Sequence, residues 1–250
     1  MKTAIATMMG FATLTTSLFS QTNVIDFQSL EAPGTGYAQA AQFYREKGFV
    51  FSSLNNFLGP FACWRTNDPH YDGSTALFDD YNEDYTCLAR SDGGYFDFLG
   101  IDLAGQLGPA QETITFGGYN GPQVAGTFQA VLNGVSWIQT FSVPSFTNLT
   151  EVRWQQVSPG HQFDNVVVYS RSGTAPPPDI HLRPASTFSS TAPLDLLHLR
   201  VGTNYVVQKS FDLQSWKPSS SFQAFTTTYY DYDFIAFDPG AAFYRLAWLQ

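Results

Sequence analysis

The run Phe163-Asp164-Asn165-Val166-Val167-Val168 decides the fold, because it joins two oxygen-bearing side chains to a fully apolar, β-branched segment. β-Branched residues favour extended strands over helices. Short segments of similar character precede this run, and turn-forming glycines, prolines and asparagines separate them. The sequence therefore predicts an all-β protein.

Alternation of apolar and polar residues identifies further strands. Within residues 95–103 the odd-numbered side chains share one face, and Phe96 and Phe98 occupy the other. Residues 112–116, followed by Gly117-Gly118, and residues 149–154 are predicted as further strands.

Two local patterns predict specific structures. Asn133-Gly134 separates residues 127–132 from residues 135–141, and this dipeptide is typical of the type I′ turn of a β-hairpin. Residues 37–47 form the only stretch that predicts a helix, with Gly48 in the position that ends it.

The composition fits sheets with aromatic cores. Charged residues make up 13% of the chain and aromatic residues 16%, against a usual charged share of about 25%. Most of the net charge of −9 belongs to residues 23–170, which contain 15 acidic and 5 basic residues, whereas residues 171–250 contain 6 of each. The acidic first part would repel nucleic acid and anionic membranes, so neither is expected as a partner.

A proline-rich segment divides the chain. Three consecutive prolines at 176–178 donate no backbone hydrogen bonds to a sheet and favour an extended spacer. We therefore expect a β-sandwich domain over residues 23–170, a linker over residues 171–180 and a small β domain over residues 181–250.

Residues 1–20 have the features of a signal peptide. Lys2 supplies the positive charge, residues 4–14 are apolar, and small residues follow up to Ser20. No later segment is apolar over the roughly 18 residues needed to span a bilayer. The sequence predicts a secreted or cell-surface protein without a membrane span in the mature chain.

Cys63 and Cys87 are the only cysteines. In an exported chain, an isolated pair most simply forms a disulfide, worth about 3 kcal/mol for a loop of this length. Two free buried thiols are the main alternative, and a metal site, for which the sequence places no histidine partners nearby, is the other.

Catalytic motifs are missing from the sequence. It contains neither Gly-x-Ser-x-Gly nor His-Glu-x-x-His, and its four histidines share no motif with a serine or cysteine. Asp97 and Asp102 are the nearest approach to a carboxylate pair, but their parity predicts opposite faces of a regular strand. We predict a protein that is not an enzyme.

The loop at residues 67–73 and the acidic stretch at residues 79–85 are the candidate ligand-binding region. Aromatic rings stack on sugar rings while carboxylates and amides bind sugar hydroxyls. An acidic loop whose tyrosines cover a sheet edge is the alternative. The candidate residues are Trp64, Tyr71, Asp72, Tyr81 and Tyr85.

Several short segments carry a resemblance in their order along the chain. They are Val24-Ile-Asp-Phe27, Gly48-Phe-Val-Phe51, Gly73-Ser-Thr-Ala-Leu77, Leu88-Ala-Arg-Ser-Asp-Gly-Gly94, Ile114-Thr-Phe-Gly-Gly-Tyr119 and Phe163-Asp-Asn-Val-Val167. This order resembles the jelly-roll domains, similar to galactose-binding and carbohydrate-binding modules, of exported bacterial surface proteins of the PEP-CTERM type. We find no sorting tail of that kind in the sequence.

A second resemblance concerns the C-terminal part. Tyr205-Val-Val-Gln-Lys-Ser-Phe-Asp-Leu-Gln-Ser-Trp216 and Phe243-Tyr-Arg-Leu246 resemble a small C-terminal β module of secreted bacterial proteins. This resemblance implies a structural or sorting role. The expected fold is a jelly-roll β-sandwich followed by a small β-sandwich-like module.

The first resemblance also implies a structural Ca²⁺ ion that joins the first and last strands of the jelly roll. Asp164 heads the last strand, Asp26 lies in the first and Glu31 in the loop that follows. Ca²⁺ takes about 6–8 oxygen ligands, some of them backbone carbonyls. The alternative role for Asp164 is to cap backbone N–H groups at a turn.

The leading functional hypothesis is binding of carbohydrate or extracellular matrix by an exported protein that is not an enzyme. A structural or adhesive surface component without a small ligand is the second hypothesis. A divergent polysaccharide-active enzyme is the third.

Overall fold

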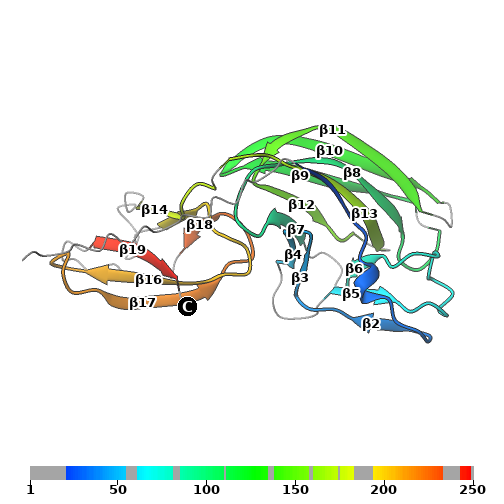
Figure 1. Ribbon diagram of the computed structural model, residues 1–250, viewed down its shortest axis with the longest axis horizontal. Helices are drawn as coiled ribbons and strands as arrows, with labels where there is room; N and C mark the ends of the chain where they lie inside the picture. Colours follow the sequence, from blue (N-terminus) through cyan, green and yellow to red (C-terminus); the bar gives the residue numbers. More distant parts are fainter. Residues whose placement is uncertain are drawn as a thin grey trace, which may run out of the picture.

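The computed structural model describes residues 21–54, 61–80, 85–109, 111–134, 138–157, 160–173, 175–182, 194–232 and 243–248. These residues form β-strands, one short 3₁₀ helix, η1 (Gln28–Leu30), and no α-helix. The strands make four antiparallel sheets, two in the first part of the chain and two in the second (Figure 1). The predicted class, an all-β chain with a β-sandwich followed by a smaller β module, is confirmed.

Sheets A and B form the sandwich. In spatial order, sheet A contains β11 (Gln139–Leu149), β8 (Phe96–Gly105), β13 (His161–Ser170), β6 (Leu77–Asp79), β5 (Phe61–Trp64) and β2 (Tyr37–Gln39), and β1 (Gln21–Ile25) also pairs with β13. Sheet B contains, in order, β10 (Gln123–Asn133), β9 (Gln111–Asn120), β12 (Glu151–Gln155), β7 (Tyr85–Arg90), β4 (Phe49–Ser53) and β3 (Phe43–Glu46). Neighbouring strands are mostly distant in sequence, so the sandwich depends on long-range pairing.

The run that decides the fold lies in the middle of sheet A. On one side β13 pairs with β8, and on the other it pairs with β6 at Phe163 and with β1 from Val166 onward. A strand with partners on both sides must be apolar where it faces the core, and Phe163, Val166 and Val168 are all buried. The strand predicted at this run is therefore confirmed.

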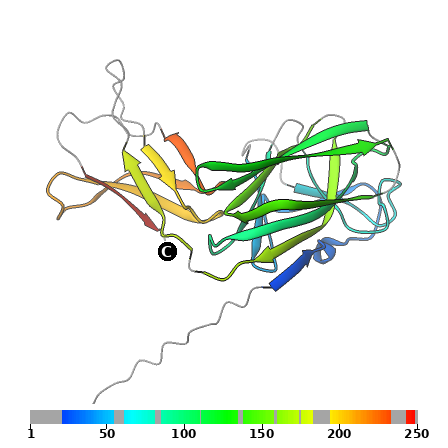
Figure 2. The same ribbon diagram turned by 90° about the horizontal axis from the view of Figure 1, so that it is seen from above.

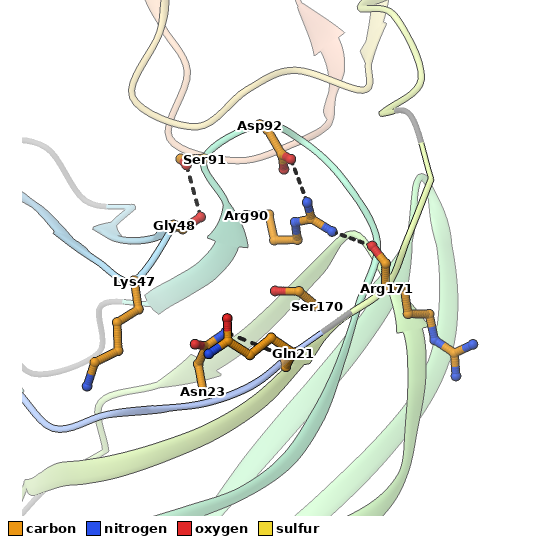
Figure 3. Close-up of a pocket in the computed structure, with 9 residues that line it drawn as sticks. All are labelled: Gln21, Asn23, Lys47, Gly48, Arg90, Ser91, Asp92, Ser170 and Arg171. Carbon is orange, nitrogen blue, oxygen red and sulfur yellow. Dashed lines mark hydrogen bonds and ion pairs between the residues drawn. The ribbon is translucent and has the colours of Figure 1, made fainter. Parts of the chain in front are cut away.

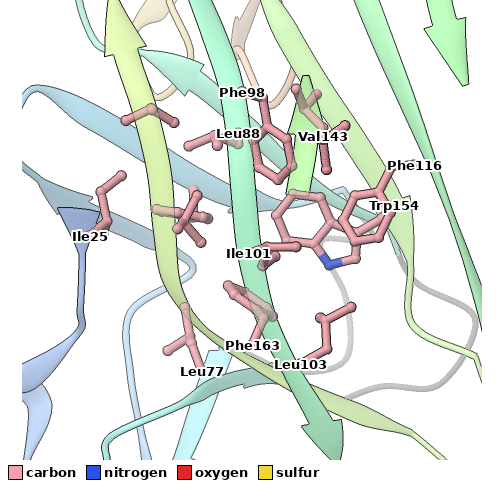
Figure 4. Packing of buried hydrophobic residues seen from close by; sticks show 14 of the residues in the cluster. Ile25, Leu77, Leu88, Phe98, Ile101, Leu103, Phe116, Val143, Trp154 and Phe163 are labelled. Atoms are coloured by element: carbon pink, nitrogen blue, oxygen red, sulfur yellow. The ribbon is translucent and has the colours of Figure 1, made fainter. Parts of the chain in front are cut away.

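Aromatic rings fill the space between the two sheets. Trp154 of sheet B meets Phe163 of sheet A edge to face with ring centroids 5.1 Å apart, and Phe51 stacks on Phe163 at 5.8 Å. Figure 4 shows Phe116, Trp154 and Phe163 in this layer together with buried aliphatic side chains. Truncating one such ring to alanine typically costs about 3–5 kcal/mol. The core is the main source of stability in the first unit.

Two local predictions were wrong. Residues 37–47 are not helical: they contain β2 and β3, and Lys47 and Gly48 form the turn between β3 and β4 with φ of 48° and 81°. Asn133-Gly134 does not close a hairpin either, because β10 pairs with β9 in sheet B and β11 pairs with β8 in sheet A. The chain crosses from one sheet to the other there, and long-range pairing overrides the local turn signal.

The alternation expected for residues 95–103 was also wrong. Phe96, Phe98, Ile101 and Leu103 all face the core, because a β-bulge shifts the register of β8. Val167 and Val168 are adjacent in β13, yet they pair with Gly100 and Phe98 in β8. Because of the extra residue, the core-facing side chains are even-numbered before the bulge and odd-numbered after it.

The C-terminal unit contains two three-stranded sheets. One comprises β14 (Asp179–Leu182), β15 (Leu194–Leu197) and β18 (Tyr229–Tyr232), and the other β17 (Lys217–Gln223), β16 (Asn204–Ser210) and β19 (Phe243–Trp248). This unit has a small core of its own around Leu196, Tyr205 and Val207. Both views place it at one end of the sandwich (Figures 1 and 2). The exact domain boundaries remain a prediction.

The two units meet in a packed interface, which we call the unit interface. Val50, Cys87 and Ala89 on the outer face of sheet B pack with Val201 of the C-terminal unit. Phe43 lies against Phe225, with ring centroids 4.8 Å apart. The proline-rich segment therefore connects two units that are in contact, although the sequence predicts it as a spacer.

The predicted disulfide is absent, because Cys63 and Cys87 are both free and buried. Cys63 belongs to β5 of sheet A, and Cys87 belongs to β7 of sheet B and packs at the unit interface. Burial raises the pKa of the Cys87 thiol to about 11. The alternative of two free buried thiols describes the structure.

Two predictions on export and membranes have different outcomes. The predicted signal peptide at residues 1–20 lies outside the described residues. No helix among the described residues is long and apolar enough to cross a membrane.

Candidate functional site

The outer face of sheet B carries a row of polar and aromatic side chains. In β9, Glu112, Ile114 and Phe116 point into the sandwich, so Thr113 and Thr115 point outward and are exposed. The same alternation turns side chains of β7, β10 and β12 outward beside them. This part of the face is open, whereas the part next to β4 is covered by the C-terminal unit.

The strand register aligns these side chains into rows. In one row Tyr85 of β7 lies opposite Gln155 of β12, and Thr115 of β9 lies opposite Gln129 of β10. Gln129 donates to the Thr115 hydroxyl at 3.4 Å. Four neighbouring strands span roughly 14 Å at the usual strand spacing. The row is therefore long enough for an extended ligand.

A groove of about 230 Å³ follows these rows, and we call it the sheet B groove. Its floor comes from strands rather than loops, which gives a rigid arrangement of side chains. Tyr85 is 44% exposed at one end of it. The lining residues are Tyr85, Thr113, Thr115, Gly117, Tyr119, Thr127, Arg153, Gln155 and Val157.

Gly117 makes room for a ring to lie on the sheet. A Cβ atom at Gly117 would come within 3.1 Å of Cε2 and of the hydroxyl of Tyr119, which is closer than nearly all real contacts of that kind. The Tyr119 ring therefore lies over the backbone of Gly117. The Arg153 guanidinium lies over the Tyr119 ring, with its carbon 4.7 Å from the ring centroid.

Arg153 is held on its other side by a buried carboxylate. Its Nε pairs with Oε1 of Glu151, which is fully buried. The second carboxylate oxygen of Glu151 accepts the backbone N–H of Thr227 in the C-terminal unit at 2.6 Å. The charges of Arg153 and Glu151 cancel, so the floor of the groove is close to neutral.

The predicted ligand-binding residues do not form one site. Tyr85 lies in the sheet B groove, whereas Trp64 belongs to β5 of sheet A. Tyr71 donates its hydroxyl to Glu31 at 3.4 Å. Tyr81 lies outside the described residues.

Asp72 borders a second cavity, of about 250 Å³, and Trp64 lies behind its wall. Asp72 lines it and accepts from the Gln162 amide at 2.9 Å, and burial raises the pKa of Asp72 although His70 lowers it. Trp64 packs under His70, with ring centroids 4.7 Å apart, and donates its indole N–H to the Gln106 carbonyl. Trp64 therefore supports the cavity wall and offers little of its ring face to a ligand.

A larger cavity, of about 370 Å³, lies between β1, the β3–β4 turn and the end of β13 (Figure 3). Its cationic side chains are already paired: Lys47 with Asp26, and Arg90 with Asp92. The Arg171 guanidinium points away from the other lining residues in Figure 3 and binds a carboxylate elsewhere. The paired charges leave this cavity poorly suited to a charged ligand.

Asp164, the proposed anchor of a Ca²⁺ ion, is 1% exposed. It accepts the Ser74 hydroxyl at 2.6 Å and the Asn165 backbone N–H at 2.7 Å. Burial raises the pKa of Asp164 to about 6, against the effect of these two hydrogen bonds, and the negative charges of Asp102 and Asp26 raise it further. The bond from Asn165 matches the alternative role of Asp164 as a backbone cap.

The other predicted metal ligands have protein partners. Burial would raise the pKa of Asp26, but its hydrogen bonds and the charge of Lys47 lower it overall. Glu31 accepts from Tyr71. In the described part of the chain, no three His, Cys, Asp or Glu side chains are grouped to hold a metal ion. The Ca²⁺ ion therefore remains a prediction from the sequence.

The parity prediction for Asp97 and Asp102 was wrong. The bulge in β8 removes the expected opposition of their faces. Asp97 binds the Arg171 guanidinium at 2.6 Å and 2.9 Å, and Asp102 accepts from Asn165 at 2.9 Å. Each carboxylate thus has a structural partner of its own.

Sequence reasoning missed most of the groove. Tyr119 and Arg153 are 34 residues apart in sequence, and only the pairing of β9 with β12 brings them together. The available signal was Gly117-Gly118-Tyr119, a glycine two positions before an aromatic residue on the same strand face.

Comparison with known proteins adds little. No family model matches the chain, and no curated protein is similar to it in sequence. The solved structures with weak similarity include the following two. An allantoicase is 10% identical with a TM-score of 0.29, covering 83% of this chain and 85% of that chain. A beta-1,2-glucanase from Parabacteroides distasonis is 12% identical with a TM-score of 0.25, covering 90% of this chain and 36% of that chain.

Proposed function

We propose that this protein binds a neutral, extended carbohydrate in the sheet B groove and carries out no reaction on it. The observation that carries the proposal is the arrangement around Tyr119. Its ring lies over Gly117 with the Arg153 guanidinium against it, beside rows of hydroxyl and amide side chains from four neighbouring strands, and the exposed ring of Tyr85 lies at one end of the rows. Aromatic faces stack on sugar rings, and hydroxyls and amides exchange hydrogen bonds with sugar hydroxyls.

The electrostatics favour a neutral sugar over an anionic one. Arg153 is the cation that lines the groove, and Glu151 neutralises it. The chain as a whole carries a net charge of −9, which opposes the approach of a polyanion. The guanidinium N–H groups can still donate to sugar hydroxyls.

The test is binding of the full chain to a panel of neutral β-glucan and α-glucan hexasaccharides, measured by calorimetry in buffer with a chelator. Tyr119→Ala should weaken binding about tenfold, because the groove loses a phenol hydroxyl, worth about 0.5–1.5 kcal/mol as a hydrogen-bond partner, and Arg153 loses the ring it lies against. Tyr85→Ala should weaken it less, because this residue lies at one end of the groove.

Tyr169→Ala is the matched control, since Tyr169 is a half-buried tyrosine of β13 in the opposite sheet. It should leave affinity unchanged. If no hexasaccharide binds, the carbohydrate hypothesis fails and a structural or adhesive role gains support. If the sugar binds but Tyr119→Ala has no effect, the groove is the wrong site. Release of shorter sugars from the same probes would show enzymatic activity.

A further inference from the structure

The unit interface contains a buried carboxylate whose two oxygens have partners in different units. Oε1 of Glu151 pairs with Arg153 in the sheet B groove, and Oε2 accepts the Thr227 backbone N–H. A fully buried carboxylate is costly without partners, so its position depends on both contacts. Glu151 thus connects a backbone group of the C-terminal unit to a side chain of the groove.

Several contacts fix the position of the Thr227 N–H relative to sheet B. The Ser52 hydroxyl of β4 donates to the Phe225 carbonyl at 2.6 Å, and the Phe225 ring packs on Phe43. Within the C-terminal unit, the Leu199 N–H donates to the Thr227 carbonyl at 2.9 Å. The segment from Phe225 to Thr227 is therefore held from both units.

We infer that the C-terminal unit is a positioning element of the carbohydrate site. It holds Glu151 through Thr227, Glu151 holds Arg153, and Arg153 lies against the Tyr119 ring. Glu151 and Thr227 act through Arg153 and do not line the groove. This inference rests on the proposed function and adds that sugar affinity depends on docking of the C-terminal unit.

Two consequences follow from thermodynamic linkage. Removing the charge of Glu151 should loosen Arg153 and lower sugar affinity, although Tyr119 and the rows of hydroxyls remain. Conversely, a bound sugar that holds Arg153 should stabilise the contact between Glu151 and Thr227. The second consequence separates a positioning role from a merely structural one.

The experiment uses the full chain and the neutral hexasaccharide that binds the unmodified chain most tightly. Glu151→Gln keeps an acceptor for the Thr227 N–H and removes the partner charge of Arg153. It should weaken binding about fivefold or more, at the lower end of usual coupling effects. In an Arg153→Ala background the same change should alter affinity by less than about twofold, because Glu151 acts through Arg153.

Hydrogen exchange at the Thr227 amide gives a readout independent of affinity. Saturation with the hexasaccharide should slow this exchange in the unmodified chain, and it should not do so in Arg153→Ala. Glu46→Gln is the matched control, because Glu46 is also an ion-paired glutamate of sheet B but contacts Lys47 and Tyr44. Glu46→Gln should change neither the affinity for the hexasaccharide nor the exchange rate of the Thr227 amide.

The outcomes separate the two proposals. If the unmodified chain binds no hexasaccharide, the proposed function fails. If it binds, and Glu151→Gln weakens binding equally with and without Arg153, the positioning role is overturned and the groove stands. Unchanged exchange at Thr227 on saturation would overturn it as well. Should Glu151→Gln fold poorly, the Thr227 exchange in the unmodified chain and in Arg153→Ala decides alone.

Discussion

Glu151 and Asp164 are two buried carboxylates at two junctions of the same molecule. Glu151 lies where the C-terminal unit meets sheet B, and it has an arginine and a backbone N–H as partners. Asp164 lies within β13, just before its register shift and near the turn that follows β1, and its partners are a hydroxyl and a backbone N–H, both uncharged. Both side chains have lost almost all contact with water.

The difference shows that the partner of a buried acid decides its effect on the fold. The ionised Glu151 is compensated by a positive charge, so its removal leaves Arg153 and the Thr227 N–H without this partner. The ionised Asp164 is stabilised by hydrogen bonds from uncharged groups, and burial raises its pKa to about 6. At neutral pH the first carboxylate stabilises its junction, and the second weakens its own.

The largest expected effect comes from breaking the Glu151 contacts. Glu151→Ala should lower the free energy of unfolding by about 3–5 kcal/mol, the usual cost of removing one partner of a buried ion pair. Denaturant unfolding of the full chain measures it. Asp212→Ala, at an exposed acid of the C-terminal unit, serves for comparison and should have a much smaller effect. A loss below about 1 kcal/mol would place Glu151 with ordinary surface acids.

The second prediction concerns pH. Because the pKa of Asp164 is higher in the folded chain than its ordinary value of 3.8, the folded state binds this proton more tightly than the unfolded state does. Its contribution to stability is therefore present below about pH 4 and is lost as the pH rises through about 6. The loss of stability is on the order of 3 kcal/mol, because the pKa rises from 3.8 to about 6 and each pKa unit corresponds to about 1.4 kcal/mol.

Asp164→Asn should remove this loss and make the chain more stable than the unmodified chain at pH 8. Melting curves from pH 4 to pH 8 test the prediction. Asp212→Asn is the control with the opposite sign, since backbone hydrogen bonds lower the pKa of Asp212 to about 2. It should leave the dependence between pH 4 and pH 8 unchanged. If Asp164→Asn loses as much stability between pH 4 and pH 8 as the unmodified chain, another group causes the pH dependence.

The third prediction tests the Ca²⁺ ion implied by the sequence resemblance. An ion that binds only the folded state would stabilise it by about 2.7 kcal/mol at about 100 times its dissociation constant. The melting temperature should then rise with the logarithm of free Ca²⁺, and Asp164→Ala should abolish the rise while Asp80→Ala keeps it. Identical melting curves in chelator and in millimolar Ca²⁺ would leave Asp164 as a backbone cap.

The smallest expected effect is that of a reductant. Because Cys63 and Cys87 lie in different sheets as free thiols, the melting temperature of the folded chain should not change when dithiothreitol is added. Mass spectrometry after alkylation in denaturant should find both thiols modified without prior reduction. A crosslinked peptide containing both cysteines would contradict the structure at this point.

The fold class was predictable because β-branched runs and alternation are local properties. Local properties predicted the strand at residues 163–168 correctly, but they failed at the glycines after Phe116. The strand is where the sequence predicts it, whereas Gly117-Gly118 predicts a stop and in fact continues β9 to Asn120. Asn133-Gly134 predicts a hairpin from local geometry, but the partner of β11 is β8, and no local pattern encodes that pairing.

The candidate site was less predictable than the fold. The sequence singles out Tyr85 for its aromatic ring in an acidic stretch, yet Tyr85 lines the groove for another reason, its register with Gln155. Glu151 gives no signal as a buried residue, because its burial depends on the C-terminal unit, where its partner Thr227 is 76 residues away in sequence. Sites built across strands and between units need the pairing before their residues can be recognised.

The position of Cys87 makes its thiol a probe for separation of the two units. Its thiol is covered by the C-terminal unit and stays protonated at neutral pH because burial raises its pKa to about 11. A thiol reagent can reach the Cys87 thiol only when the two units separate or sheet B opens. The rate of its modification therefore measures how often such openings occur. Cys63, buried at a different place in sheet A, records the openings of the sandwich alone.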